Sequence, residues 1–155
     1  MIVLALQQHA LVRSWAVVLR IMTIRRRNGQ GASVMDELVE RLVAKVGIER
    51  TVAEKSVGII LAFLLSEGPA DKVQTLMDRL PGAEAAAKAA ANSSGGIGGL
   101  MGGIMGVGTK LMSAGLGMGQ MQTVTREIIA FAREKAGEDV VGEIVGAIPG
   151  LGQFV

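Results

Sequence analysis

The clearest alternation of apolar and polar positions lies between residues 34 and 46. Apolar side chains recur there every three or four residues, as on the buried face of an amphipathic helix. They are Leu38, Val39, Leu42, Val43 and Val46. Ser33 is placed to cap the start of this helix, and Gly47 to end it in a left-handed conformation. The pattern therefore predicts a helix over residues 34–46.

A second helix is predicted to begin at Thr51, and its sequence is entirely apolar over residues 59–65. Thr51 and Glu54 have the spacing of a capping box, in which each side chain accepts a hydrogen bond from the other residue's backbone amide. An apolar run of two turns leaves no face for solvent, so we expect this helix to be the central one.

Four further helices are expected. An amphipathic pattern over residues 121–135 places Val124, Ile128 and Phe131 inward. Two short helices have matching apolar positions over 73–80 and 141–148, and Pro69 and Asp71 in the first and Glu138 and Asp139 in the second suit a helix start. Both end before Pro-Gly, because proline disfavours a helical residue ahead of it. The alanine-rich segment 83–91 is predicted to be an exposed helix.

The second half of the chain repeats part of the first at a fixed offset of 68 residues. Eight identities lie between positions 47 and 82 and their counterparts: Gly47 with Gly115, Ile60 with Ile128, Ala62 with Ala130, Phe63 with Phe131, Asp71 with Asp139, Val73 with Val141, Pro81 with Pro149 and Gly82 with Gly150. Gly119 and Gln122 stand where the predicted capping box lies in the first copy. A duplicated unit of helices predicts an all-α fold, a small helical bundle of two pseudo-repeats.

The domain expected from this pattern covers residues 35–155. Repeat one spans 35–91 and repeat two 104–155, joined by a loop over 92–103 that is rich in glycine and methionine. The segment 104–114 falls where the first helix lies in the other copy, and we interpret it as a degenerate helix. Residues 1–34 form a separate basic arm.

The glycine-rich middle allows two interpretations. Gly95, Gly99 and Gly103 repeat every four residues, as in helices that pack closely within lipid. The alternative, which we favour, is a tightly packed helix or a tether in a protein outside the membrane. The expected contacts with a membrane or a protein partner are the apolar residues of this segment: Ile97, Leu100, Met101, Ile104 and Met105.

The methionines Met101, Met105, Met112, Met118 and Met121 are expected to fill the core rather than to form an adaptable binding surface. The same region resembles a phosphate loop in its glycine spacing, but Thr109 precedes Lys110. A phosphate loop needs the opposite order, so nucleotide binding is not expected.

Charge is distributed unevenly along the 155 residues, whose net charge is +2. Residues 1–34 carry five arginines and no acid, whereas the remainder is net acidic. Arg25, Arg26 and Arg27 form a group that suits anionic lipid headgroups, while the acidic remainder argues against nucleic acid as a partner.

The arm itself is open to several interpretations: a disordered segment, an organellar transit peptide, or translated upstream sequence with Met35 as the biological start. Its apolar stretch is interrupted by Gln7, His9, Arg13 and Arg20, so no membrane span is predicted.

Composition removes most of the chemistry that enzymes use. The chain has no cysteine and a single histidine, His9, so neither a transition-metal site nor a base for a nucleophilic triad is expected. Acidic pairs such as Glu37 and Glu40 lie on polar helix faces and are interpreted as solvated surface. We therefore predict no catalytic, cofactor-binding or metal-binding residue. The lack of cysteine fits a reducing compartment, and we expect the cytoplasm.

Two runs of sequence, "MDELVERLVAKVGIERTVAEKSVGIILAFL" and "EIIAFAREKAGEDVVGEIVGAIPGL", carry a resemblance. Together with "LMDRLPGAEAAA" and the glycine-rich middle, they resemble a bacterial family of small helical proteins of unknown function. Members have helical segments closed by Leu-Pro-Gly around a glycine-rich middle. The resemblance covers about residues 35–151 and implies a helical fold in a bacterial protein, with no functional residue to transfer.

From these observations we predict a non-enzymatic helical module that acts through an unknown protein partner or through self-association as a homo-oligomer. The alternative is a peripheral membrane protein that uses the glycine- and methionine-rich segment together with the arginine arm.

Overall fold

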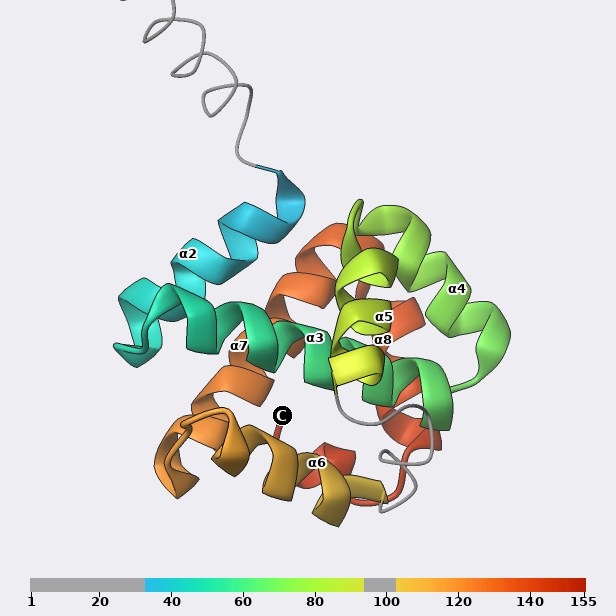
Figure 1. Ribbon diagram of the computed structural model, residues 1–155. Helices are drawn as coiled ribbons and strands as arrows, with labels where there is room; N and C mark the ends of the chain where they lie inside the picture. Colours follow the sequence, from blue (N-terminus) through green and yellow to red (C-terminus); the bar gives the residue numbers. More distant parts are fainter. Residues whose placement is uncertain (1–32, 94–102) are drawn as a thin grey trace, which may run out of the picture. The chain divides into compact units, whose positions relative to one another are not determined.

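A computed structural model of the chain describes residues 33–93 and 103–155, so the predictions for the arm and for most of the glycine-rich loop lie outside the described residues. Within these ranges every regular element is a helix, which confirms the all-α prediction. The elements are α2 (Val34–Val46), α3 (Arg50–Glu67), α4 (Ala70–Arg79), α5 (Ala83–Ser93), α6 (Gly103–Ser113), α7 (Met118–Ala136), α8 (Glu138–Ala147) and the 3-10 helix η2 (Leu151–Gln153) (Figure 1).

The two ends of α2 have the caps that the sequence predicts. The Ser33 hydroxyl accepts a hydrogen bond from the Asp36 amide at 3.1 Å, and the Asp36 carboxylate accepts one from the Ser33 amide at 3.3 Å. Gly47 ends the helix with φ of +72°, a conformation that glycine adopts without the clash of a Cβ atom.

The predicted capping box at the start of α3 is wrong. The helix begins one residue earlier, at Arg50, so Thr51 lies inside its first turn. Glu54 pairs instead with Arg50 at 3.0 Å. A capping interaction does occur in the second half, but two residues earlier than its predicted place, where the Gln120 side chain accepts a hydrogen bond from the Gly117 amide at 2.9 Å.

Helix α3 is the central helix, as the apolar run predicts. It contacts α2, α4, α5, α6 and α7. Residues 59–64 are buried one after another, while Leu65 at the end of the run is 38% exposed. The buried side chains of α3 therefore supply surface for neighbours on all sides, and they include the floor of the pocket described below.

The alanine-rich helix α5 is packed against α3, not exposed as predicted. Ala83 and Ala87 are buried. The contact is close at Gly58, where a Cβ atom would lie 2.8 Å from the Ala86 carbonyl oxygen and 2.9 Å from the Ala90 Cβ. Small residues on both helices allow this approach. Alanine favours a helix whether that helix is exposed or packed, so its helix propensity does not predict the contact with α3.

Helix α7 is amphipathic, as predicted, with Val124, Ile128 and Phe131 buried. Phe63 of α3 is buried as well. The predicted short helices are α4 and α8, which contact each other. After each of them the chain turns at a Pro-Gly pair whose glycine has positive φ, +92° at Gly82 and +86° at Gly150.

Helix α6 matches the degenerate helix predicted over 104–114, and it contacts α3 and α7. Only two of its residues, Val107 and Leu111, are buried. A Cβ atom at Gly106 or Gly108 would meet no atom within 4 Å, so packing does not require glycine at either position. The helix is therefore held by few contacts and has glycines that weaken it.

Candidate apolar binding site

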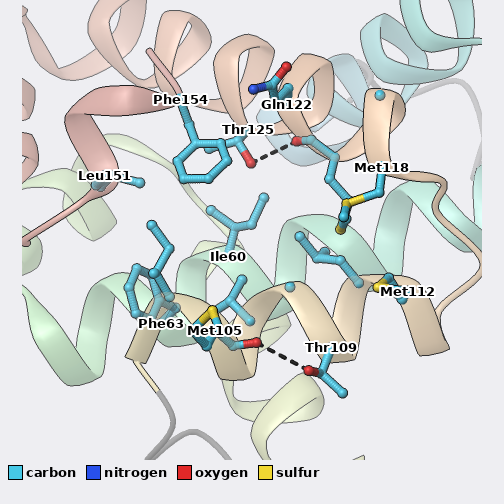
Figure 2. Close-up of a pocket in the computed structure, with 16 residues that line it drawn as sticks. Ile60, Phe63, Met105, Thr109, Met112, Met118, Gln122, Thr125, Leu151 and Phe154 are labelled. Carbon is cyan, nitrogen blue, oxygen red and sulfur yellow. Dashed lines mark hydrogen bonds between the residues drawn. The ribbon is translucent and has the colours of Figure 1, made fainter.

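A pocket of about 620 Å³ lies between α3, α6, α7 and the C-terminal residues. Buried Ile60 and Phe63 of α3 form part of its wall, and Leu151 and Phe154 contribute from the end of the chain. In Figure 2, Met105 of α6 lies across the pocket from Phe154, with Ile60 between them, and Met112 of α6 lies opposite Met118. Its volume lies within the range of small-molecule sites.

The outer part of the pocket, which we call the methionine rim, consists of Met105, Met112 and Met118. These side chains are 80%, 55% and 76% exposed, respectively. Met121 also lines the pocket and is partly buried. The expectation that the methionines fill the core is therefore wrong for the rim residues, which α6 and the start of α7 present to solvent.

The few polar groups in the pocket wall are largely satisfied within the protein. The Thr109 hydroxyl donates to the Met105 carbonyl at 3.2 Å, and the Thr125 hydroxyl donates to the Met121 carbonyl at 2.9 Å (Figure 2). Gln122 adds an amide. The described residues that line the pocket include no acidic or basic side chain. The wall therefore offers apolar contact and no general acid, general base or charge-stabilising group.

Several charged side chains of the described helices form ion pairs between helices. The Arg41 guanidinium of α2 contacts two carboxylates of α7, Glu127 at 2.9 Å and Glu134 at 2.8 Å, and Lys45 also reaches Glu127 at 3.2 Å. Burial alone would raise the pKa of Glu127, but the Lys45 and Arg41 partners outweigh it and hold that pKa below its ordinary value.

The acids interpreted as solvated surface are also paired. Glu37 receives the Lys135 ammonium at 3.0 Å, and Glu40 lies 3.8 Å from Arg50. In the second half, Glu143 of α8 pairs with Lys72 of α4 at 2.9 Å. These contacts join separate helices, and the side chains that make them do not line the pocket between α3, α6 and α7, so we assign them a structural role.

The predicted contact residues divide into two groups. Ile104 and Met105 line the pocket, as residues of α6. Ile97, Leu100, Met101 and the arginines Arg25, Arg26 and Arg27 lie outside the described residues. No sequence pattern marks Ile60, Phe63, Leu151 or Phe154 as part of a site, because each looks like an ordinary core residue when only its own segment is considered.

Two further observations bear on the membrane and metal expectations. Among the described helices none has both the length and the hydropathy that crossing a bilayer requires. Residues 33–93 and 103–155 bring together no cluster of three or more acidic or histidine side chains suited to a metal ion.

Comparison with known proteins returned no matching family, no matching curated protein and no matching solved structure.

Proposed function

We propose that this protein is a non-enzymatic interaction module, and that it associates with a second copy of itself through the methionine rim. One observation carries the proposal. On the described surface, four large apolar side chains are exposed, and three of them, Met105, Met112 and Met118, stand around a single pocket. Clustered apolar surface of this kind marks a contact site.

The chemistry of the rim supports association over catalysis. Methionine side chains are unbranched and polarizable, so they adapt to an apolar partner surface. A two-fold dimer places the same patch of each copy face to face, so a patch that is apolar throughout is compatible with itself. Among the described residues, the pocket wall adds no charged side chain that would oppose the approach of a second copy.

The proposal is tested by sedimentation velocity of the full chain over a range of concentrations. We expect a concentration-dependent dimer, and we expect the double variant Met105→Ser, Met118→Ser to remain monomeric. Leu65→Ser is the matched control, because Leu65 is 38% exposed but does not line the pocket. A monomer at all concentrations, or a dimer that the double variant leaves unchanged, would contradict the proposal.

A second candidate is binding to a membrane surface through α6. Ile104 and the exposed Met105 lie where the sequence analysis placed lipid contacts, next to Ile97, Leu100 and Met101 in sequence. Arginines such as Arg25, Arg26 and Arg27 would hold anionic headgroups. Flotation of the full chain with anionic and with zwitterionic vesicles tests this function. Failure to float with either kind of vesicle removes it.

We also propose that the domain arose by duplication of a unit of three helices. When α2, α3 and α4 are shifted by 68 positions, their bounds fall within one residue of those of α6, α7 and α8. The contacts between the two units are also equivalent under this shift, since α2 contacts α7 and α6 contacts α3. The first helix of each unit thus packs on the second helix of the other.

Duplication offers a reason for the position of the pocket. At the offset of 68 residues, Arg41 of α2 corresponds to Thr109 of α6, and Phe131 corresponds to Phe63. Arg41 covers the Phe131 ring at 5.9 Å. Thr109 is shorter than arginine, and both Thr109 and Phe63 line the pocket, which lies along the equivalent seam between α6 and α3.

A further inference from the structure

Beneath the methionine rim, the structure assigns the pocket a ligand: we infer that it binds the unbranched alkyl chain of an amphiphile. This inference goes beyond the proposed self-association, because it concerns the interior of the pocket and not its rim.

The wall selects for a chain without polar groups. The hydroxyls of Thr109 and Thr125 already donate to backbone carbonyls of their own helices. A ligand donor or acceptor placed at the depth of Ile60 and Phe63 would lose its bonds to water and find little in exchange, which is costly. An alkyl chain has no such groups and loses nothing.

The size and the side chains of the pocket favour a flexible chain over a rigid ring system. At about 620 Å³ the space is several times larger than apolar cavities that bind a single benzene. Its wall combines Ile, Leu and Val with four methionines, whose three rotatable side-chain bonds allow them to follow the path of a chain.

The polar head of the amphiphile would remain at the solvent-exposed side of the pocket. Gln122, which is exposed, is the amide available to it there. Because no described lining residue is charged, the head should contribute little to affinity, whether it is a hydroxyl or a carboxylate. Affinity should instead follow the length of the chain.

The test is calorimetric titration of the full chain with alkan-1-ols from octanol to dodecanol, below their solubility limits. Burial of one methylene contributes about 0.8 kcal/mol, so the Kd should fall about fourfold for each added carbon. Dodecanoate should bind within a few-fold of dodecanol. No saturable binding, or a Kd that does not depend on chain length, overturns the inference.

Two glycines of one helix supply a matched pair of variants. A Cβ atom at Gly106 or Gly108 would meet no neighbour within 4 Å, but only Gly108 lines the pocket. Gly108→Leu should therefore weaken dodecanol binding at least tenfold, whereas Gly106→Leu should leave it within about twofold. Equal effects of the two substitutions overturn the inference.

A measurement on the wild-type protein keeps the inference testable if Gly108→Leu fails to fold. With methyl-labelled methionine, dodecanol should shift the resonances of Met105, Met112, Met118 and Met121. It should leave Met35 and Met77, which do not line the pocket, in place. Shifts spread evenly over all six residues overturn the inference.

Two further experiments test where the alkyl chain comes from and whether its binding is independent of self-association. If anionic phospholipid vesicles displace dodecanol, the chain comes from a lipid, and if they do not, it comes from a free amphiphile. Binding only to vesicles, with none to free alkanols, overturns the inference. Because Gly108 lines the pocket and is not part of the methionine rim, Gly108→Leu should weaken dodecanol binding and leave the sedimentation behaviour unchanged, so a failure of self-association and a failure of chain binding can be distinguished.

Discussion

At the scale of single residues, glycines in this protein have opposite roles that their sequence context does not reveal. Gly58 lies where α3 and α5 meet, and an added Cβ atom there would lie under 3 Å from Ala86 and Ala90. Gly106 of α6 has open space. We therefore expect Gly58→Ala to reduce the free energy of unfolding by about 1–3 kcal/mol, because overpacking outweighs the gain in helix propensity.

The matched substitution Gly106→Ala should have the opposite sign, raising the free energy of unfolding by up to about 1 kcal/mol. Urea denaturation of both variants measures the pair. Stabilisation of the protein by Gly58→Ala would mean that the contact between α3 and α5 is looser than described.

A second prediction at this scale concerns acid stability. The folded-state pKa of Glu127 is held below its unfolded value by Lys45 and Arg41, so the carboxylate stabilises the fold above the unfolded pKa. This contribution is lost as pH falls through the folded-state pKa. Glu127→Gln should reduce the free energy of unfolding by about 1–2 kcal/mol at pH 7, with a difference that shrinks below about pH 4.

Glu40→Gln is the control for that experiment, since the Glu40 side chain is 66% exposed and 3.8 Å from Arg50. It should have no measurable effect at either pH. A difference between wild type and Glu127→Gln that stays constant from pH 7 to pH 3 would contradict the assignment of the stabilisation to this carboxylate.

At the scale of elements, the sequence predicted those helix ends that are set by nearby capping residues or by proline. The start and end of α2 followed from Ser33 and Gly47, and the ends of α4 and α8 from the Pro-Gly pairs. The start of α3 was predicted wrongly. Glu54 accepts a hydrogen bond from Arg50 within the same helix, and Thr51 lies inside the first turn, where it cannot act as the N-cap. The spacing of Thr51 and Glu54 alone does not determine whether the Glu54 carboxylate accepts from the Thr51 amide or from the Arg50 side chain.

The candidate site was predicted only in part, for the same reason. Met105 and Ile104 were identified because glycine-rich sequence with apolar side chains is unusual. The other lining residues, such as Ile60, Phe63, Leu151 and Phe154, were not identified. The pocket is formed jointly by α3, α6, α7 and the C-terminal residues, which are far apart in the sequence. The periodicity of apolar residues within one helix cannot predict a space that remains between several helices.

Helix α6 should be the least protected helix of the described residues in amide hydrogen exchange. It has glycines at 103, 106 and 108 and only two buried side chains, while α3 has ten buried residues. Opening of α6 should therefore occur at much lower free energy than global unfolding. Exchange of the α6 amides as slow as that of α3, measured on the full chain, would contradict this expectation.

At the scale of the whole domain, the crossed contacts predict that neither half folds alone. Helix α2 needs α7, and α6 needs α3, so a fragment of residues 33–92 would leave apolar faces of α2 and α3 uncovered. We expect little cooperative melting for this fragment in circular dichroism. Mixing it with a fragment of residues 93–155 should restore helical content. A fragment 33–92 that melts cooperatively on its own would contradict this prediction.

The most direct test of the central claim, that the methionine rim is the contact surface, is a concentration series of the full chain labelled at its methionine methyl groups. We predict that the resonances of Met105, Met112 and Met118 shift or broaden as protein concentration rises, because the rim becomes buried against a second copy. Met35 and Met77, which stand outside the rim, should not change. Rim resonances that stay constant up to millimolar protein, or changes confined to Met35 and Met77, would contradict the claim.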